Sequence, residues 1–235
     1  MTKIALITGA NRGLGLETAR LLVEAGMTVI VGARDVARGE AAAAEIGASS
    51  LPLDVGDAAS VARAAATVEE RHGRLDLLVN NAGILPEAPG VLDTRMARAT
   101  LDTNVLGPML VIEHFLPLLR RADAARIVNV SSTMGSLADQ SDPGSPYYGL
   151  VVPGYQASKA ALNSFTIGLA KLLADTPIKV NAVCPGWVQT DLAPGNREQA
   201  PTPAADAARV VVRYAQLDAD GPTGGFFDAE RAVAW

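Results

Sequence analysis

Tyr155 and Lys159 lie four residues apart in the run Tyr-Gln-Ala-Ser-Lys, a spacing that places both side chains on one face of a helix. A phenol has an unperturbed pKa of about 10, too high for ready proton exchange at neutral pH. A neighbouring ammonium favours the phenolate, so we expect Lys159 to lower the pKa of Tyr155 and fit it for general acid catalysis. The spacing alone also fits a half-buried tyrosine beside a solvated lysine, and other motifs have to decide.

A glycine-rich turn, Thr-Gly-Ala-Asn-Arg-Gly-Leu-Gly at residues 8–15, follows a short apolar run near the N-terminus. Gly9, Gly13 and Gly15 let the backbone turn and approach a pyrophosphate, while the helix that follows offers unpaired N–H groups to it. The spacing is GxxxGxG, which differs from the GxGxxG of the general dinucleotide fingerprint. An ordinary strand-to-helix turn is the alternative, and the place of this turn after the first strand disfavours it.

Arg34 and Arg38 flank the start of the next expected helix, in Ala-Arg-Asp-Val-Ala-Arg. Cations are disfavoured at a helix N-terminus, so the two arginines indicate a nearby anion, and the 2′-phosphate of NADP is bound at this place in dinucleotide folds. We therefore expect NADP(H) as the cofactor, with two solvated arginines as the alternative. Asp35 lies where an NAD-selecting acid is sought, but it suits a helix N-cap better, and Ala33 takes the end of the strand.

Short β-branched runs alternate along the chain with longer Ala/Leu-rich segments of helical period, which is typical of strand–helix units around a parallel sheet. We expect an α/β fold in which residues 1–235 form one doubly wound Rossmann domain, with a seven-stranded parallel sheet and helices on both faces. The expected strands are residues 3–8, 28–32, 50–53, 75–80, 126–130, 179–183 and 225–227. The expected helices begin near Gly13, Asp35, Asp57, Asp93, Asn104, Tyr155 and Pro203. Residues 135–154, rich in Gly, Pro and Ser, predict an irregular loop inserted ahead of Tyr155.

Composition excludes several classes of function. The net charge of −5 and the pI near 5.1 give no basic footprint for nucleic acid or an anionic membrane surface. The N-terminus runs into a strand without a cleavable signal, so we expect a soluble cytoplasmic protein with neither nucleic acid nor membrane as partner. A single cysteine, Cys184, excludes an internal disulfide and suits a buried side chain better than a nucleophile. No spacing of His, Cys and carboxylates predicts a metal site.

With these residues in hand, the chain resembles the short-chain dehydrogenase/reductase family over essentially its whole length. The motifs that carry the resemblance are the turn at residues 8–15, Asp54-Val55, Asn80-Asn81-Ala82-Gly83, Asn104 in Thr-Asn-Val, Ser132 in Val-Asn-Val-Ser-Ser, Tyr155 with Lys159, and Pro185-Gly186 with Val188 and Thr190. Residues 33–39 and 184–192 and the ending with Trp235 look most like the carbonyl reductase subgroup. The insertion before Tyr155 is a feature of that subgroup, and its intermediate length leaves the range of substrates open.

The resemblance implies hydride transfer from a reduced nicotinamide to a ketone or aldehyde, with Tyr155 as proton donor. It also implies that Ser132 binds the carbonyl oxygen and that Asn104 holds a water for proton relay through Lys159. The cofactor residues that it implies are Gly9, Asn11, Arg12, Gly13, Leu14, Gly15, Arg34, Arg38, Asp54, Val55, Asn81, Ala82, Gly83, Tyr155, Lys159, Pro185, Gly186, Val188 and Thr190.

The expected substrate pocket contains Ser132, Tyr155 and Trp187, although Trp187 fits equally a role in packing. Ser132 is chosen over Ser131 by the family register, since neighbouring side chains alternate along a strand. The expected partner is a small-molecule carbonyl compound. Two alternatives stay open: a reductase of quinones, imines or activated double bonds, and a non-catalytic NADP-binding sensor. The sequence does not decide between a monomer and a homodimer or homotetramer.

Overall fold

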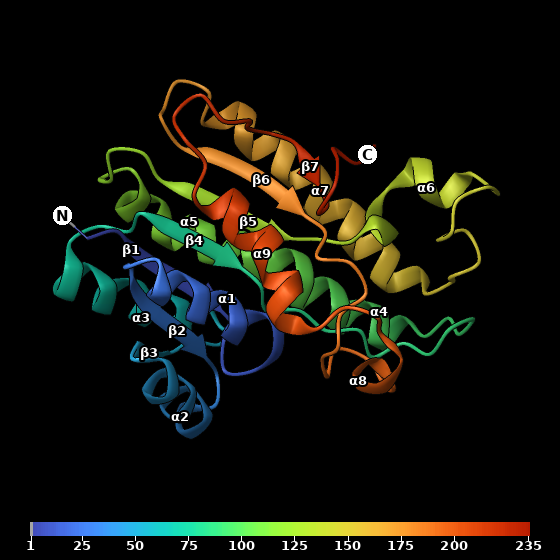
Figure 1. The fold of residues 1–235 in the computed structure, drawn as a ribbon, viewed down its shortest axis with the longest axis horizontal. Helices are drawn as coiled ribbons and strands as arrows, with labels where there is room; N and C mark the ends of the chain where they lie inside the picture. Colours follow the sequence, from blue (N-terminus) through green and yellow to red (C-terminus); the bar gives the residue numbers. More distant parts are fainter. Residues whose placement is uncertain (1) are drawn as a thin grey trace.

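The sheet of this computed structural model, which describes residues 2–235, contains seven parallel strands in the order β3-β2-β1-β4-β5-β6-β7 (Figure 1). The strands are β1 (Ile4–Thr8), β2 (Thr28–Ala33), β3 (Ser49–Pro52), β4 (Leu77–Asn80), β5 (Arg126–Val130), β6 (Lys179–Val183) and β7 (Phe226–Phe227). Strand order reverses between β1 and β4, where doubly wound sheets bind their ligands outside the carboxyl ends of the strands. The predicted doubly wound fold is confirmed.

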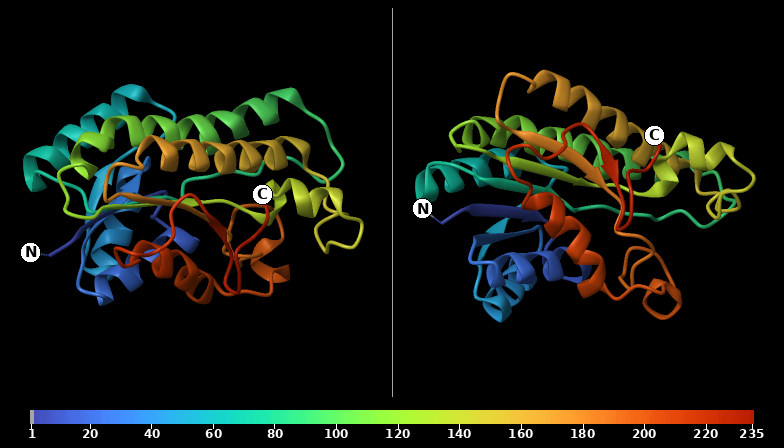
Figure 2. Two further views of the ribbon diagram at one scale, coloured as in Figure 1. Left: turned by 90° about the horizontal axis from the view of Figure 1, so that it is seen from above. Right: turned by 45° about the horizontal axis from the view of Figure 1, so that its top comes forward.

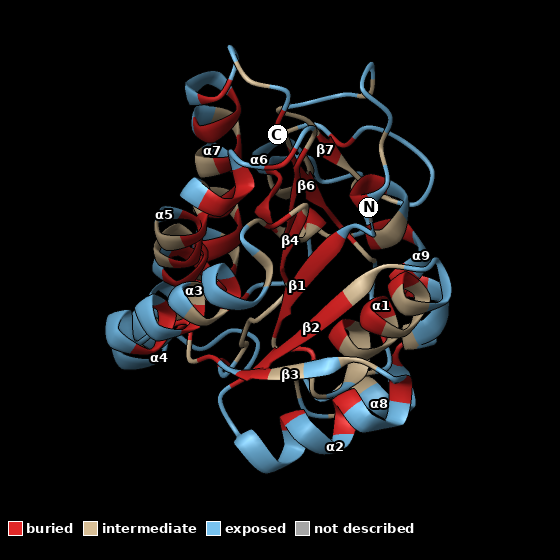
Figure 3. Cartoon of the chain, turned by 90° about the vertical axis from the view of Figure 1, so that its left-hand side faces the viewer, coloured by how far each residue is buried: buried red, intermediate tan, exposed pale blue. Residues whose placement is uncertain are grey.

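Helices cover both faces of the sheet (Figures 2 and 3). One face carries α1 (Gly13–Glu24), α2 (Val36–Ile46) and α9 (Ala204–Ala215), and the other carries α3 (Ala58–His72), α5 (Gly107–Leu119) and α7 (Pro153–Leu172). α4 (Thr94–Leu101) runs into α5 through a π-helical turn, Asp102–Leu106. Three short elements complete the fold: a 3₁₀ turn (Thr133–Gly135), α6 (Leu137–Ser141) and α8 (Asn196–Gln199).

The central strands are apolar throughout because both of their faces are buried. Leu6 and Leu78 pack into the core beneath α3, α5 and α7, whereas Ile7 and Leu77 pack into the core beneath α1, α2 and α9. This alternation follows from the two-residue period of a strand. Each of these side chains is fully buried and contributes about 1.5–3 kcal/mol relative to an exposed position.

Aspartates begin three of the helices, as predicted. The side chains of Asp35, Asp57 and Asp93 accept hydrogen bonds from the first backbone N–H groups of α2, α3 and α4. Each bond satisfies a donor that has no partner inside its helix. Asp35 is thus an N-cap, as expected from its place beyond Ala33.

Several elements begin one or two residues from their predicted starts. β3 begins at Ser49 and β4 at Leu77, and α7 begins at Pro153 because the fixed φ of proline suits the first position of a helix. Asn104 does not begin a helix; it lies within the π-helical turn between α4 and α5.

The predicted irregular loop is also shorter than residues 135–154, and it contains α6. A Cβ on Gly135 would lie 2.5 Å from the Lys159 carbonyl carbon, so the start of this segment is packed tightly against α7. Gly154 at its end belongs to α7 itself. Most of residues 137–151 are exposed, and these form the loop proper.

Among residues 2–235, the helices lack the combination of length and apolar character that crossing a bilayer requires.

Candidate active site

Tyr155 and Lys159 share the buried face of α7, where their side chains are 5% and 6% exposed. Lys159 Nζ lies 5.6 Å from the centre of the phenol ring and donates a 2.8 Å hydrogen bond to the carbonyl of Val130, the last residue of β5. The ammonium is therefore fixed to the carboxyl end of the sheet, beside the phenol, as the spacing of the two residues predicts.

Burial controls the proton affinities of both groups. It raises the pKa of the Tyr155 phenol above its ordinary value; an electrostatic interaction with Cys184 adds to this effect and a hydrogen bond with Ser132 opposes it. Burial also lowers the pKa of Lys159 to about 8. In the protein alone the pKa of the phenol is thus shifted in the direction opposite to the one predicted from the neighbouring lysine, because burial removes the phenolate from water.

Ser131 and Ser132 follow β5 and contact different residues of α7. Ser131 Oγ is buried and donates a 2.6 Å hydrogen bond to Asn163 Oδ1 on α7. Ser132 lies beside Tyr155, and its Oγ accepts a 3.2 Å bond from the N–H of Met134 in the 3₁₀ turn. The serine chosen by the family register is the one beside the phenol.

The buried side chain of Asn104 joins two segments. Its Oδ1 accepts a 2.9 Å bond from the N–H of Ile84, and its Nδ2 donates to the carbonyl of Ile84 at 3.0 Å and to Ser158 Oγ at 3.1 Å. The amide therefore ties the segment that follows β4 to α7. A role for Asn104 in holding a water stays a prediction.

The glycine-rich turn has the features of an anion site. Gly9 and Gly13 have φ values of 65° and 55°, in the left-handed region that favours glycine. Arg12, the N-cap of α1, makes no capping hydrogen bond with its side chain, in contrast to the aspartates that begin α2, α3 and α4. The first N–H groups of α1 therefore point out of a turn that fits a pyrophosphate.

Asn81 connects the end of β4 to this turn. Its Nδ2 donates to the carbonyls of Thr8 and Gly9 at 2.9 and 3.2 Å, while Thr8 Oγ1 accepts 3.0 Å bonds from the N–H groups of Asn81 and Ala82. A Cβ on Gly15 would lie 2.5 Å from Asn81 Nδ2. The strip from Asn81 to Gly83 thus lies against the turn, at the point where strand order reverses.

The predicted adenine residues lie at the same edge of the sheet. Asp54 and Val55 follow β3, and Asp54 Oδ1 accepts a 3.0 Å bond from the N–H of Gly56. Arg34 is exposed directly after β2, and Arg38 Nε lies 3.4 Å from Asp35 Oδ2 with most of its side chain exposed.

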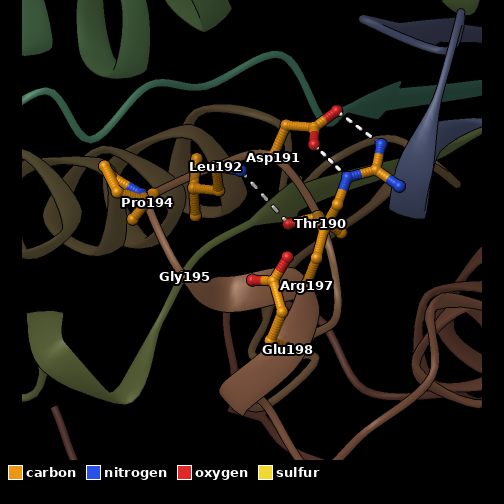
Figure 4. A pocket seen from close by; sticks show the side chains of 8 residues that line it. Thr190, Asp191, Leu192, Pro194, Gly195, Arg197 and Glu198 are labelled. Carbon is orange, nitrogen blue, oxygen red and sulfur yellow. Dashed lines mark hydrogen bonds and ion pairs between the residues drawn. The ribbon is translucent and has the colours of Figure 1, made fainter.

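The segment that follows β6, residues 185–199, contacts the glycine-rich turn at residues 8–15. A Cβ on Gly13 would lie 3.2 Å from Thr190 Cγ2, and Arg12 forms an ion pair with Asp191. Figure 4 shows the hollow that this segment lines, with the Asp191 carboxylate facing Arg197. Hydrogen bonding to Arg197, with a further contribution from Arg12, lowers the pKa of Asp191 to about 2.

Trp187 in the same segment is 51% exposed, and its indole N–H donates a 3.0 Å bond to Asn196 Oδ1. Its predicted place in the substrate pocket stays a prediction.

The sequence analysis did not single out two features of this region. One is Glu87, whose carboxylate accepts hydrogen bonds from the N–H groups of Gly154 and Tyr155, and the other is the Asp191–Arg197 ion pair. Over the part of the chain that the structure describes, no group of three or more His, Cys, Asp or Glu side chains is arranged to hold a metal ion.

A protein-family model described as short chain dehydrogenase matches residues 3–201. The chain therefore belongs to the short-chain dehydrogenase family of oxidoreductases, which use a nicotinamide cofactor, and the predicted family is confirmed.

Three relatives illustrate the range of this similarity. The chain is 36% identical over 224 residues to short-chain dehydrogenase anuI of Penicillium roqueforti, covering 90% of this chain and 88% of that protein. It is 31% identical over 312 positions to (−)-isopiperitenone reductase of Mentha piperita, covering 99% of this chain and 98% of that protein. Among solved structures, an NADPH-bound carbonyl reductase from chicken fatty liver superposes with a TM-score of 0.85 at 28% identity and full coverage of both chains.

Proposed function

We propose that this protein is an NADPH-dependent carbonyl reductase that converts ketones or aldehydes to alcohols, with residues 1–235 acting as one catalytic domain. The observation that carries the proposal is the buried phenol of Tyr155, which lies beside Ser132 and one helical turn from Lys159. This group and the glycine-rich turn both lie at the carboxyl edge of the sheet, where the fold class binds its ligands. The similarity to an NADPH-bound carbonyl reductase supports the choice of reaction.

The cofactor site is assigned from the residues that surround the turn. Gly9, Gly13 and Gly15 admit the pyrophosphate, and Arg12, Arg34 and Arg38 bind the 2′-phosphate. The remaining assignments follow the family motifs. Asp54 and Val55 would contact the adenine, residues 81–83 would line the cofactor, and Val188 and Thr190 would contact the nicotinamide. When bound, NADPH supplies the hydride.

The proton comes from the protein. The phenol of Tyr155, whose pKa is raised by burial, carries its proton at neutral pH and is placed to donate it to a carbonyl oxygen on which negative charge develops. Ser132, beside the phenol, hydrogen-bonds the same oxygen. Lys159, with a pKa lowered to about 8, titrates near neutrality and is suited to return a proton to the site.

The loop between α6 and α7 is proposed to cover the substrate. Its exposed apolar side chains include Tyr148, Leu150 and Val151, and Leu137 is exposed at the start of α6. Apolar surface at the entrance to a site favours an apolar ligand over a sugar or a charged metabolite. The proposed substrates are accordingly small apolar carbonyl compounds.

The test is Tyr155→Phe, which keeps the aromatic ring and removes only the hydroxyl. We expect a loss of roughly 10²–10⁴-fold in kcat with little change in NADPH affinity, measured by NADPH oxidation over ketones, aldehydes, quinones and enones. Lys159→Ala should also lose activity. Tyr147→Phe and Tyr148→Phe serve as controls from the loop. Near-normal ketone reduction by Tyr155→Phe, with activity lost in a loop variant instead, would refute the assignment of the acid.

A further inference from the structure

Glu87 is a buried carboxylate that the proposed chemistry does not use. It lies between β4 and α4, and its side chain is only 4% exposed. Its Oε2 accepts a 2.6 Å hydrogen bond from the N–H of Tyr155, and its Oε1 accepts a 3.0 Å bond from the N–H of Gly154. Both oxygens of one side chain thus hold the first turn of α7.

α7 lacks a capping side chain at its own N-cap position. Val152 occupies that position and makes no side-chain hydrogen bond, whereas α2, α3 and α4 are each capped by an adjacent aspartate. A carboxylate is favourable at a helix N-terminus because it accepts from unpaired N–H groups and opposes the partial positive charge of the helix end. Glu87 supplies this cap from 68 residues away, and one of the bonds reaches Tyr155 itself.

The packing around the Glu87 carboxylate leaves no space for a side chain at position 154. A Cβ on Gly154 would lie 2.6 Å from Glu87 Oε1 and 2.9 Å from the Cα of Ala97 on α4. Glycine at this position therefore lets α4 and the carboxylate approach the first turn of α7. The close fit limits the positions that this turn can adopt.

The carbonyl of Tyr155 is held as well. Ser158 Oγ donates to it at 2.7 Å, and the same Oγ accepts the 3.1 Å bond from Asn104 Nδ2. Because Asn104 also binds the backbone of Ile84, both anchors of Tyr155 lead back to the segment that follows β4. That segment begins beside the glycine-rich turn, where Asn81 is hydrogen-bonded to Thr8 and Gly9. The hydrogen bonds therefore hold the backbone of Tyr155 in a defined position relative to the proposed cofactor site.

We propose that Glu87 is a positioning residue of the reaction: by binding the N–H groups of Gly154 and Tyr155, it sets the position of the Tyr155 hydroxyl relative to Ser132 and Lys159. The inference rests on the proposed role of Tyr155 as the acid. Reacting groups displaced by about 1 Å can lose about 10²-fold in rate. Loss of the cap should therefore lower kcat, while KM and the affinity for NADPH change little.

Glu87→Gln is the first test, because it keeps the shape of the side chain but turns one acceptor oxygen into an amide donor that faces a backbone N–H. Glu87→Asp keeps both acceptor oxygens on a shorter side chain. Gly154→Ala disturbs the same contact from the side of α7, because the added Cβ would lie 2.6 Å from Glu87 Oε1. Asp93→Asn is the matched control, because it removes a capping carboxylate from α4, which carries no proposed catalytic residue.

We expect Glu87→Gln and Gly154→Ala to lower kcat by roughly 10- to 100-fold, with KM and the NADPH dissociation constant within about threefold of their original values. Glu87→Asp should recover part of the loss, and Asp93→Asn should retain kcat even where it lowers the melting temperature. Hydrogen exchange of the peptide covering residues 153–159 should speed up in Glu87→Gln, and this readout needs no activity.

Two outcomes overturn the inference. In one, Glu87→Gln lowers the melting temperature as Asp93→Asn does, yet the folded protein keeps its kcat. In the other, Glu87→Gln fails to fold while Glu87→Asp and Gly154→Ala fold and keep full kcat. If Tyr155→Phe is inactive while the Glu87 and Gly154 variants are normal, only this inference fails. If Tyr155→Phe is itself active, the proposed function fails first.

Discussion

Arg12 Nη1 lies 2.8 Å from Asp191 Oδ2, so an ion pair joins the glycine-rich turn to the segment that follows β6. Arg197 binds the same carboxylate, and the two arginines hold the pKa of Asp191 near 2. In the proposed complex, Arg12 binds the 2′-phosphate of the cofactor. Asp191 therefore competes with that phosphate for one guanidinium.

Asp191→Asn should tighten the binding of NADPH and leave that of NADH unchanged. An exposed ion pair contributes about 0–1 kcal/mol, so releasing Arg12 should lower the NADPH dissociation constant by up to about fivefold. Titration calorimetry with both cofactors measures this change. Arg197→Ala is the control: Asp191 then pairs with Arg12 alone, so the NADPH dissociation constant should not fall. Weaker NADPH binding in Asp191→Asn would show that the carboxylate supports the cofactor instead of competing with it.

Replacing Arg34 and Arg38 together by alanine should weaken NADPH binding far more than NADH binding. A charge-assisted hydrogen bond to phosphate contributes about 1.5–3 kcal/mol, and NADH lacks the phosphate that would receive it. Arg38 gives up only an exposed 3.4 Å contact with Asp35 when it turns to a ligand. Arg63→Ala, an exposed arginine on α3, is the control. Equal affinity of the unmodified protein for NADPH and NADH would contradict the choice of cofactor.

The local signals of the sequence were sufficient for most of the fold. A run of β-branched residues and an aspartate before a helix act through the residues beside them, so the strands and the caps at Asp35, Asp57 and Asp93 could be predicted. The choice of Ser132 over Ser131 depended on strand alternation and on the family register.

Long-range contacts and desolvation were beyond the reach of the sequence. Glu87 stands in an ordinary-looking Pro-Glu-Ala-Pro stretch, and only the packing of α4 against α7 brings it to Tyr155. The spacing of Tyr155 and Lys159 shows which charges are neighbours but not how much water is lost, and the loss of water reverses the expected pKa shift of the phenol.

Replacing residues 142–149 with a short glycine-serine linker should change the preference among substrates while folding and NADPH affinity stay largely intact. Most of these residues are exposed, and the packed positions Gly135 and Gly154 remain in place. Circular dichroism and the melting temperature report folding, and kcat/KM over a series of carbonyl compounds of increasing size reports the preference. If the shortened chain does not fold, the loop is part of the core, and its role as a substrate cover has to be abandoned.

Lys159 should make the stability of the cofactor-free protein rise with pH. Burial lowers its pKa from 10.5 to about 8, so below about pH 8 the native state carries a buried charge. Between these two values the unfolded chain binds the proton and the native protein does not, and unfolding therefore becomes less favourable as pH increases. The shift corresponds to roughly 3–4 kcal/mol.

Lys159→Met removes this titrating group. The free energy of unfolding of the native protein, minus that of the variant, should therefore increase from about pH 8 to about pH 10.5, measured by urea denaturation at steps of pH. The raised pKa of Tyr155 acts in the opposite direction above its ordinary value of 10.0, but this phenol is present in both proteins and largely cancels in the difference. A difference that stays constant across this range would mean that Lys159 remains charged in the native state, and the proton return assigned to it would lose its basis.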